Sequence, residues 1–398
     1  MRILVADKFP ESGLAHLREN HDVEFQPGLS GDDLPDAIGD SEVLIVRSTN
    51  VTAATIEAGS SLALVVRAGA GTNTIDKQAA ADHAVYVSNV PGRNAIAVAE
   101  LTLGLILAID RRIPDNVADL RSGSWNKATY SKGTGLLGRS LGIVGVGAIG
   151  MAVATRAASF GLELHAVDKP RDPVTAERME DLGFVLHPSL AAMAADVDIL
   201  SFHVPATADT RNLLNAELLK AVRPGTVIVN TSRADVVDEA ALLEVIDEKE
   251  LWVALDVFAG EPASGQGDVS SPLGEHARVY ATHHIGASTA QAQAAVATGV
   301  LEVIDAFADG VIVNCVNLEP RVPDTTRIAV RHKDRVGVLA AILTVIRDAG
   351  INVEHMSNLV FQGAKAASAT LDLKGSVELE LLARLAEIPD VIYARRTT

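Results

Sequence analysis

The fold of this chain is decided by residues 141–168, which read LGIVGVGAIGMAVATRAASFGLELHAVD. A buried strand runs into a turn that carries Gly145, Gly147 and Gly150, and a helix of small residues follows. A second strand then ends at Asp168. One glycine permits the turn, one lets a pyrophosphate approach the backbone, and one lets helix and strand pack closely. This order predicts a dinucleotide-binding unit.

The helix that begins at this turn would place its free N–H groups and positive dipole end against the pyrophosphate. Asp168 would then accept hydrogen bonds from the hydroxyls of the adenosine ribose. Lys169 and Arg171 follow closely and could accept a 2′-phosphate, so NADP stays open beside NAD. Asp168 favours NAD, because its charge repels that phosphate.

The composition indicates a folded protein of more than one domain. A chain of 398 residues exceeds one ordinary core, and 48% apolar with 21% charged residues is a globular composition. The net charge of −17 argues against nucleic-acid and anionic-membrane partners, since Coulomb repulsion opposes both. An anionic substrate must therefore be bound by locally placed arginines.

The cysteine count, the N-terminal residues and the lengths of the apolar runs lead us to expect a cytoplasmic protein. Cys315 is the single cysteine, which excludes an intramolecular disulfide and fits a reducing compartment. The N-terminal residues read as a first strand and turn rather than as a signal peptide. We expect no membrane span, because no apolar run approaches the roughly 20 residues required.

Strands and helices alternate along most of the chain, which predicts parallel sheets in an α/β fold. We expect two Rossmann-like domains, with the NAD-binding domain (residues 91–280) inserted into a discontinuous substrate-binding domain (residues 1–90 and 281–318). A long apolar helix over residues 94–120 would cross between them. Residues 319–326, with two prolines, form a linker. Residues 327–398 predict a ferredoxin-like βαββαβ module.

Three polar groups follow successive strands of the second half. Arg233, Glu261 and His284 make a coherent set for oxidising a 2-hydroxy acid. Arginine grips the carboxylate, histidine takes the hydroxyl proton, and glutamate raises the histidine pKa. His283 stands beside His284, but neighbouring side chains of an extended chain point apart. With one cysteine in the chain, we expect no metal site.

Two further arginines end strands in the first half. Arg47 precedes Ser48, and Arg67 precedes a glycine-rich turn. Ligands of open α/β sheets collect at the carboxyl ends of strands, so both arginines are candidates for an acidic substrate, and Arg47 with Ser48 is expected to bind one. The alternative is that each arginine caps a neighbouring helix or forms an ion pair on the surface.

The chain resembles the D-isomer specific 2-hydroxyacid dehydrogenases along most of residues 1–318. The matching stretches are VRST at 46–49, RAGAG at 67–71, residues 141–150, HVP at 203–205, NTSR at 230–233, ALDVF at 254–258 with EP at 261–262, and HIGAST at 284–289. His283 stands where this family usually has proline, and we expect it to be a bystander.

The resemblance implies a role for each matching position. Arg233 would be the substrate-binding catalytic arginine, Glu261 the acid partner and His284 the proton donor and acceptor. Arg47, Ser48 and Asn94 would hold the phosphate or carboxylate of the substrate. Beside the glycines, NAD would contact Ala148, Ile149, Asp168, Val204, Thr231 and Asp256.

The C-terminal module resembles an ACT domain, through RHKDRVGVL at 331–339 and GIN at 350–352. In this family such modules bind L-serine between two copies, which implies an effector role for His332, Asp334 and Asn352. Asp334 stands where asparagine is usual, and Val336 where proline is usual. The alternative is that the module only dimerises.

The resemblance implies NAD-dependent oxidation of D-3-phosphoglycerate to 3-phosphohydroxypyruvate in L-serine synthesis. The ACT module favours this reaction, since amino-acid feedback suits a biosynthetic step. The alternatives are reduction of glyoxylate or hydroxypyruvate, another D-2-hydroxy acid, or a dinucleotide-sensing binding protein without catalysis. ACT pairing and the apolar helix after Asn94 lead us to expect a homo-oligomer, either a dimer or a tetramer.

Overall fold

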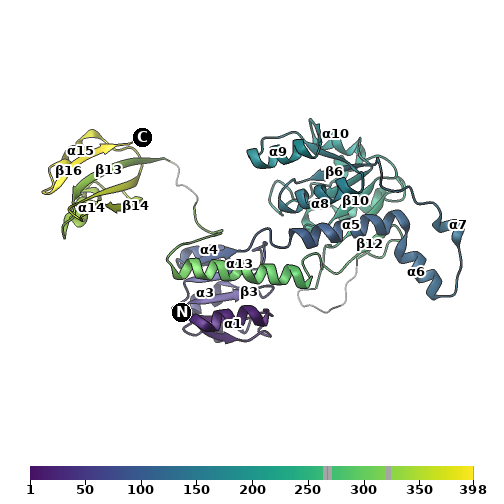
Figure 1. Cartoon of the computed structure of the whole chain (residues 1–398), viewed down its shortest axis with the longest axis horizontal. Helices are drawn as coiled ribbons and strands as arrows, with labels where there is room; N and C mark the ends of the chain where they lie inside the picture. Colours follow the sequence, from purple (N-terminus) through teal and green to yellow (C-terminus); the bar gives the residue numbers. More distant parts are fainter. Residues whose placement is uncertain (263–266, 268–270, 320–323, 398) are drawn as a thin grey trace. The chain divides into compact units, whose positions relative to one another are not determined.

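The computed structural model describes residues 1–262, 267, 271–319 and 324–397, and it contains three sheets (Figure 1). It divides into two compact units, Met1–Asn317 and Leu318–Thr398. The middle of the expected linker, residues 320–323, lies outside the described residues. Of the described helices, none combines the length and apolarity required to cross a bilayer.

The first sheet has five parallel strands in the order β2-β1-β3-β4-β5. Its strands are β1 Arg2–Val5, β2 Asp22–Phe25, β3 Val43–Val46, β4 Leu64–Arg67 and β5 Tyr86–Asn89. Its helices are α1 Glu11–Asn20, α2 Leu34–Ala37, α3 Ala53–Ala58, α4 Lys77–Asp82 and the late α13 Ala290–Ala308.

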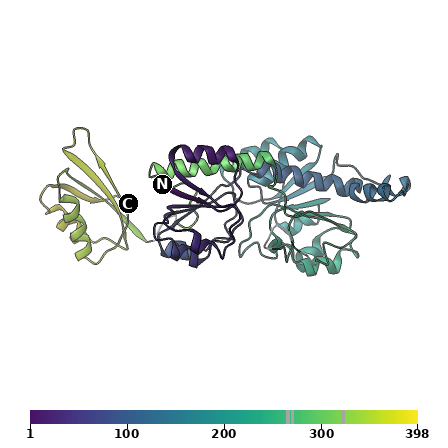
Figure 2. The same ribbon diagram turned by 90° about the horizontal axis from the view of Figure 1, so that it is seen from below.

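Both faces of this sheet are buried, as the apolar strands require. Ile3 and Val5 face α1 and α13, which lie side by side in Figure 2, while Leu4 faces the layer of α2, α3 and α4. Helix α13 contributes Val300 and Ile304 to the first of these cores. A helix from late in the chain therefore completes the packing of the N-terminal sheet.

The second sheet has seven parallel strands in the order β12-β11-β10-β9-β6-β7-β8. They are β6 Ser140–Val144, β7 Glu163–Val167, β8 Val185–His187, β9 Ile199–Phe202, β10 Val227–Asn230, β11 Trp252–Leu255 and β12 Val279–Ala281. Its helices are α5 Ala95–Arg111, α6 Ile113–Arg121, α7 Lys127–Tyr130, α8 Ala148–Ser159, α9 Pro173–Asp181, α10 Leu190–Ala194, α11 Ala216–Ala221, the 3₁₀ helix η1 Ala234–Val236, and α12 Glu239–Val245.

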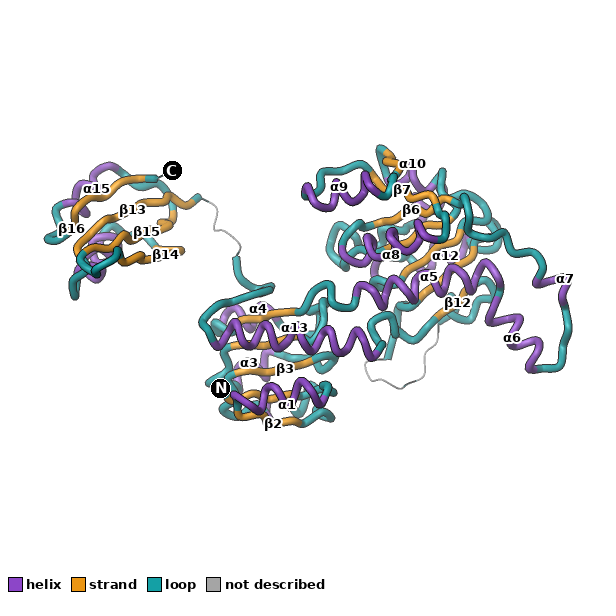
Figure 3. The backbone as a smooth tube through the Cα atoms, viewed as in Figure 1, coloured by secondary structure: helices purple, strands orange, loops and turns teal. Residues whose placement is uncertain are grey.

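The expected single helix over residues 94–120 is wrong, because α5 and α6 are separate helices that meet at an angle (Figure 3). Arg112 between them has a left-handed backbone with φ of 49°. Pro114 lies in the first turn of α6, where a proline is tolerated; within one continuous helix it would lack the N–H for its hydrogen bond and clash with the carbonyl of Asp110, so the break falls just before it. The edge strand β2 was not expected, because its sequence DVEF lacks a buried apolar pattern.

The C-terminal unit is an antiparallel sheet in the order β14-β15-β13-β16. Its elements are β13 Thr325–Lys333, α14 Val338–Asp348, β14 Val353–Val360, β15 Ala366–Lys374, α15 Leu379–Ala386 and β16 Val391–Arg396. Alternate residues of β13 are buried, and Ile328 and Val330 share a core with Ile342 of α14 and Leu381 of α15. The expected βαββαβ module is confirmed.

Candidate active site

The glycine turn after β6 is built by close contacts between backbones. A Cβ atom at Gly145, where φ is 100°, would lie 2.5 Å from the carbonyl oxygen of His203. A Cβ atom at Gly150 would lie 2.0 Å from the carbonyl oxygen of Gly145, so α8 begins directly against the strand end. Gly147 faces open space. The turn thus has two glycines required by packing and one at an open surface, which suits a pyrophosphate.

Ala148 and Ile149 form the first turn of α8, and Val204 lies against Gly145, where its Cγ1 would be 2.8 Å from an added Cβ. Asp168 follows β7, and its backbone N–H donates to the carbonyl of His187 at 2.7 Å. Arg171 donates to the carbonyls of Val167 and Lys169. This guanidinium therefore closes the turn after β7.

Arg233 is held in the loop after β10 by its neighbours. The Asn230 side chain donates to the Arg233 carbonyl at 2.9 Å and accepts from the backbone and hydroxyl of Ser232. Arg233 Nη1 donates to the Ser232 carbonyl at 2.6 Å. Thr231, in the same loop, shares a hydrogen bond of 3.0 Å with Thr102 of α5. Buried polar contacts of this kind restrain the direction of the guanidinium.

Three arginines gather at the strand ends of both sheets. A Cβ atom at Gly71 would lie 2.4 Å from Nη2 of Arg233, so Arg233 reaches the glycine-rich turn that follows Arg67. Burial, with the nearby charges of Arg233 and Arg47, lowers the pKa of Arg67 to about 10. Among the described residues, none of the three forms an ion pair with a carboxylate. Mutual repulsion of unpaired cations is relieved when an anion binds between them.

Glu261 and His284 are joined by a hydrogen bond of 2.7 Å between Oε2 and Nδ1. This bond raises the pKa of His284, although burial opposes the shift. Burial raises the pKa of Glu261, but hydrogen bonds from His284 and from the Phe258 backbone outweigh it, so the pKa of this carboxyl is lowered. With Nδ1 bound to the carboxylate, Nε2 of His284 is the nitrogen left for a substrate.

Asp256 is buried and accepts three hydrogen bonds from the loop that carries His284. Thr282 donates its hydroxyl at 2.6 Å, and the backbones of Ile285 and Gly286 donate at 2.9 and 2.8 Å. His284 itself has a positive φ of 51°. The carboxylate therefore fixes a loop with an unfavourable backbone conformation, a role that the sequence did not reveal. His283 is exposed and has no hydrogen bond among the described residues.

Arg47 and Ser48 lie in the turn after β3, and all three backbone N–H groups from Arg47 to Thr49 donate to Asp7. Asn94 precedes α5 without capping it through its side chain. Sequence reasoning missed Asp7. A signal was available, because Asp7 stands two residues after the buried strand β1, at the sheet edge where Arg47 and Arg67 lie.

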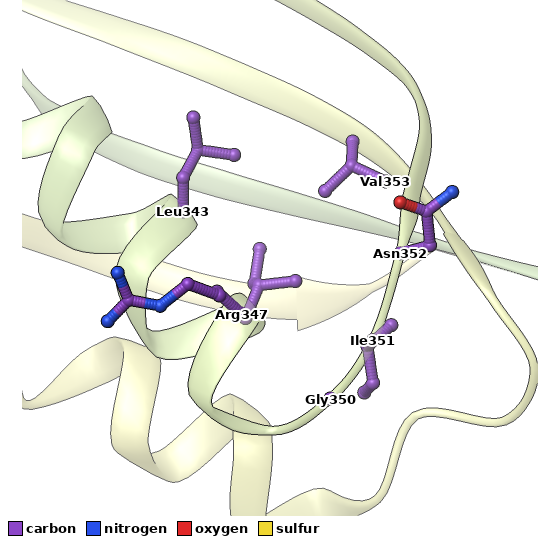
Figure 4. Close-up of a pocket in the computed structure, with 7 residues that line it drawn as sticks. Leu343, Arg347, Gly350, Ile351, Asn352 and Val353 are labelled. Atoms are coloured by element: carbon purple, nitrogen blue, oxygen red, sulfur yellow. The ribbon is translucent and has the colours of Figure 1, made fainter.

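The three residues expected to bind an effector lie in different environments. Asn352 lines an open pocket of about 470 Å³ with Leu343, Arg347 and Gly350 (Figure 4). His332 is buried in β13, with its ring nitrogens bound to the Lys333 carbonyl and the Asn358 side chain. Asp334 is exposed after β13. Of the three, only Asn352 lines this pocket.

Among the described residues, His165, His187 and Asp196 come close enough to suggest metal ligands. Their geometry favours a hydrogen bond instead. Nδ1 of His165 lies 2.8 Å from Nε2 of His187, whereas two nitrogens on one tetrahedral zinc lie about 3.3 Å apart. Nε2 of His165 is also buried without a partner, and a ligating histidine normally has one.

The chain is similar to known dehydrogenases and, at its C-terminal end, to ACT domains. Residues 103–286 match the family described as "D-isomer specific 2-hydroxyacid dehydrogenase, NAD binding domain", and residues 326–357 match the ACT domain. D-3-phosphoglycerate dehydrogenase of Methanocaldococcus jannaschii is 37% identical over 81% of this chain and 60% of its own length. The Mycobacterium tuberculosis enzyme of that name is 40% identical over 76% of this chain and 56% of its own length. The chain thus spans less than two thirds of these relatives.

Two shorter relatives are covered almost completely. Hydroxypyruvate reductase of Thermotoga maritima is 39% identical over 76% of this chain and 97% of its own length. A solved protein of Thermus thermophilus superposes with a TM-score of 0.69 and 30% identity, over 79% of this chain and 100% of that chain.

Proposed function

This chain belongs to the D-isomer specific 2-hydroxyacid dehydrogenases, and from that premise we propose that it is a D-3-phosphoglycerate dehydrogenase. It would oxidise the C2 hydroxyl of D-3-phosphoglycerate to the ketone of 3-phosphohydroxypyruvate, in L-serine biosynthesis. The observation that carries the proposal is the cluster of Arg47, Arg67 and Arg233 without carboxylate partners among the described residues. A substrate with both a carboxylate and a phosphate supplies the missing negative charge.

Arg233 would bind the carboxylate with its planar fork and polarise the C2 oxygen. Neutral His284 would accept the hydroxyl proton at Nε2, because its Nδ1–H donates to Glu261. Glu261 would stabilise the imidazolium that forms. NAD, when bound, supplies the acceptor for the hydride that leaves C2. In the reverse direction the same imidazolium returns the proton to the carbonyl oxygen.

The cofactor residues remain a proposal, and the strand-end geometry supports NAD over NADP. Asp168 stands at the end of β7, and Arg171 donates to two backbone carbonyls there. A guanidinium engaged in this way is not aimed at a 2′-phosphate, and the charge of Asp168 repels one. Gly145, Gly147 and Gly150 with Ala148 and Ile149 would bind the pyrophosphate, while Val204, Thr231 and Asp256 would line the nicotinamide half.

Hydroxypyruvate reduction is the second candidate, and the Thermotoga maritima relative supports it. The two candidates differ in charge, since hydroxypyruvate has no phosphate. NADH formation should be recorded in parallel with D-3-phosphoglycerate, glycolate and D-lactate, and NADH consumption with hydroxypyruvate. A higher kcat/KM for the unphosphorylated acids would overturn the proposed substrate. No turnover with any acid would favour a dinucleotide-sensing protein.

Regulation and assembly complete the proposal. The pocket at Asn352 contains an amide that donates to Glu354 and the Arg347 guanidinium, which donates to Asp348 through Nε and Nη2. An amino-acid carboxylate could replace these acids as the acceptor, and L-serine is the proposed effector. His332 and Asp334 would contribute only through a second copy or a rearrangement.

Exposed apolar side chains along and after α6, at Ile113, Leu120 and Trp125, support a homo-oligomer. A dimer or tetramer in the cytoplasm is therefore proposed.

The domain division is also proposed. The core shared by α13 and β1 supports joining residues 281–318 to residues 1–90 as one discontinuous domain around the NAD-binding domain. Separate expression of residues 91–280 tests it, because a true domain would fold without the rest.

A further inference from the structure

The carboxylate of Asp7 binds three consecutive backbone N–H groups through one oxygen. Oδ2 accepts from Arg47 at 2.6 Å, from Ser48 at 3.0 Å and from Thr49 at 3.1 Å. Successive N–H groups that converge in this way form a nest for an anion, and here the anion belongs to the protein. The conformation of the turn after β3 therefore depends on a charge that lies forty residues earlier in the chain.

The turn presents the two residues proposed to bind the anionic end of the substrate. Ser48 is exposed, and the Arg47 guanidinium has no ion-pair partner within the described ranges. Asp7 is not such a partner, because its contacts to this turn are with the backbone. It nevertheless places a negative charge near the cluster, where its Coulombic effect opposes the lowering of the Arg67 pKa. Asp7 thus shapes the turn while leaving the guanidinium available to a ligand.

The NAD-binding half of the site uses the same construction. Asp256 follows β11 and gathers the hydroxyl of Thr282 with the backbone N–H groups of Ile285 and Gly286. In each case an acid at a strand end holds the loop that carries a proposed functional side chain. Backbone contacts of this type are directional, so a displaced carboxylate displaces the loop.

We propose that Asp7 is a positioning residue for substrate binding: it holds the Arg47–Ser48 turn in the conformation that receives the anionic substrate, and it touches neither substrate nor cofactor. The inference rests on the proposed function, because Arg47 and Ser48 are assigned to the substrate there. It predicts that loss of the Asp7 charge weakens substrate binding and spares the chemical step.

The first test is Asp7→Asn in the full chain. An amide has nearly the same shape and can offer one oxygen to the same three N–H groups, but it carries no charge, so the three hydrogen bonds lose their charge assistance. Loss of charge-assisted hydrogen bonds predicts a KM for D-3-phosphoglycerate raised by roughly tenfold to a hundredfold. The turnover number and the NADH dissociation constant should stay within about threefold. The matched control is Asp76→Asn, which removes a carboxylate that caps α4 through Ala79 and leaves the Asp7 contacts intact.

A double-mutant cycle with Arg47→Ala separates positioning from a general loss of structure. If Asp7 acts through the turn, Asp7→Asn should raise KM much less in the Arg47→Ala background than in the wild type. Three results would each overturn the inference. The factors by which the two single variants raise KM could simply multiply in the double variant, KM could be unchanged in Asp7→Asn, or Asp7→Asn and Asp76→Asn could raise KM equally. If the wild type prefers an unphosphorylated acid, the proposed substrate fails, and the same cycle is then read with that acid.

Discussion

Nδ1 of His284 lies 2.7 Å from Oε2 of Glu261, although the two residues are 23 positions apart. The loops after β11 and β12, which are neighbouring parallel strands, bring them together. The contact leaves Nε2 as the imidazole nitrogen that would face the proposed substrate. It also raises the pKa of His284, which would set the pH range of the proposed base.

Glu261→Gln should move the pH dependence of oxidation. Oxidation needs neutral His284, so in the wild type kcat/KM falls as the pH decreases through a pKa above the ordinary value of 6.5. The amide removes the charge that raises this pKa, and the acidic limb should move to lower pH while the maximal rate decreases. A kcat/KM profile across the neutral range measures both effects. An acidic limb at the wild-type position would contradict the pairing.

His284→Ala should lower turnover by roughly 10²–10⁴-fold and leave NADH binding almost unchanged, because it removes the acid–base group. His283→Ala is the matched control, since that neighbouring side chain is exposed and should tolerate the change. Stopped-flow turnover and NADH fluorescence titration report the two properties. Near-wild-type turnover in His284→Ala would exclude its proposed role.

Arg233→Lys should lose most of the activity, although it keeps the positive charge. An ammonium cannot reproduce the two parallel hydrogen bonds of a guanidinium to a carboxylate. We expect a higher KM and a lower kcat in steady-state assays. Arg223→Lys, at an exposed pair with Asp198, should remain active. Equal kinetics of both variants would show that Arg233 has a structural role.

Gly145→Ala should abolish NADH binding and destabilise the protein. The new Cβ would lie 2.5 Å from the His203 carbonyl oxygen, at a φ of 100° that L residues rarely adopt. Gly183→Ala is the control, because its φ is also positive but no atom lies within 4 Å of the new Cβ. We expect it to cost only about 1–2 kcal/mol in unfolding free energy and to bind NADH normally. Indistinguishable variants would rule out the packing argument.

His203 should make the protein acid-sensitive. Burial lowers its pKa to about 4 from 6.5, so the unfolded chain binds a proton that the folded chain resists. The contribution of neutral His203 to the unfolding free energy is therefore fully present above pH 6.5. It decreases by on the order of 3 kcal/mol as the pH decreases towards 4. His203→Gln should reduce the pH dependence of the melting temperature over this window. An identical pH dependence in the variant would refute the assignment.

The sequence alone determined the glycine turn, the family and most of the order of the elements, although it missed β2 and the division between α5 and α6. Strand periodicity and the spacing of Gly145, Gly147 and Gly150 are local properties, so they can be recognised without a fold. The strand-end rule also identified Arg233, Glu261 and His284 as a group, and Glu261 and His284 do meet. The helix break at Arg112 had a local signal in Pro114 that the apolar pattern obscured.

Only the tertiary structure decided which groups hold these residues in place. Asp7 binds the turn of Arg47, and Asp256 binds the loop of His284, yet the position of each carboxylate after a strand does not reveal which distant backbone it holds. The approach of Arg233 to the turn after Arg67 likewise depends on how two sheets face each other. Such contacts join residues far apart in the chain. Their geometry is set by strand order and packing, which a local pattern does not encode.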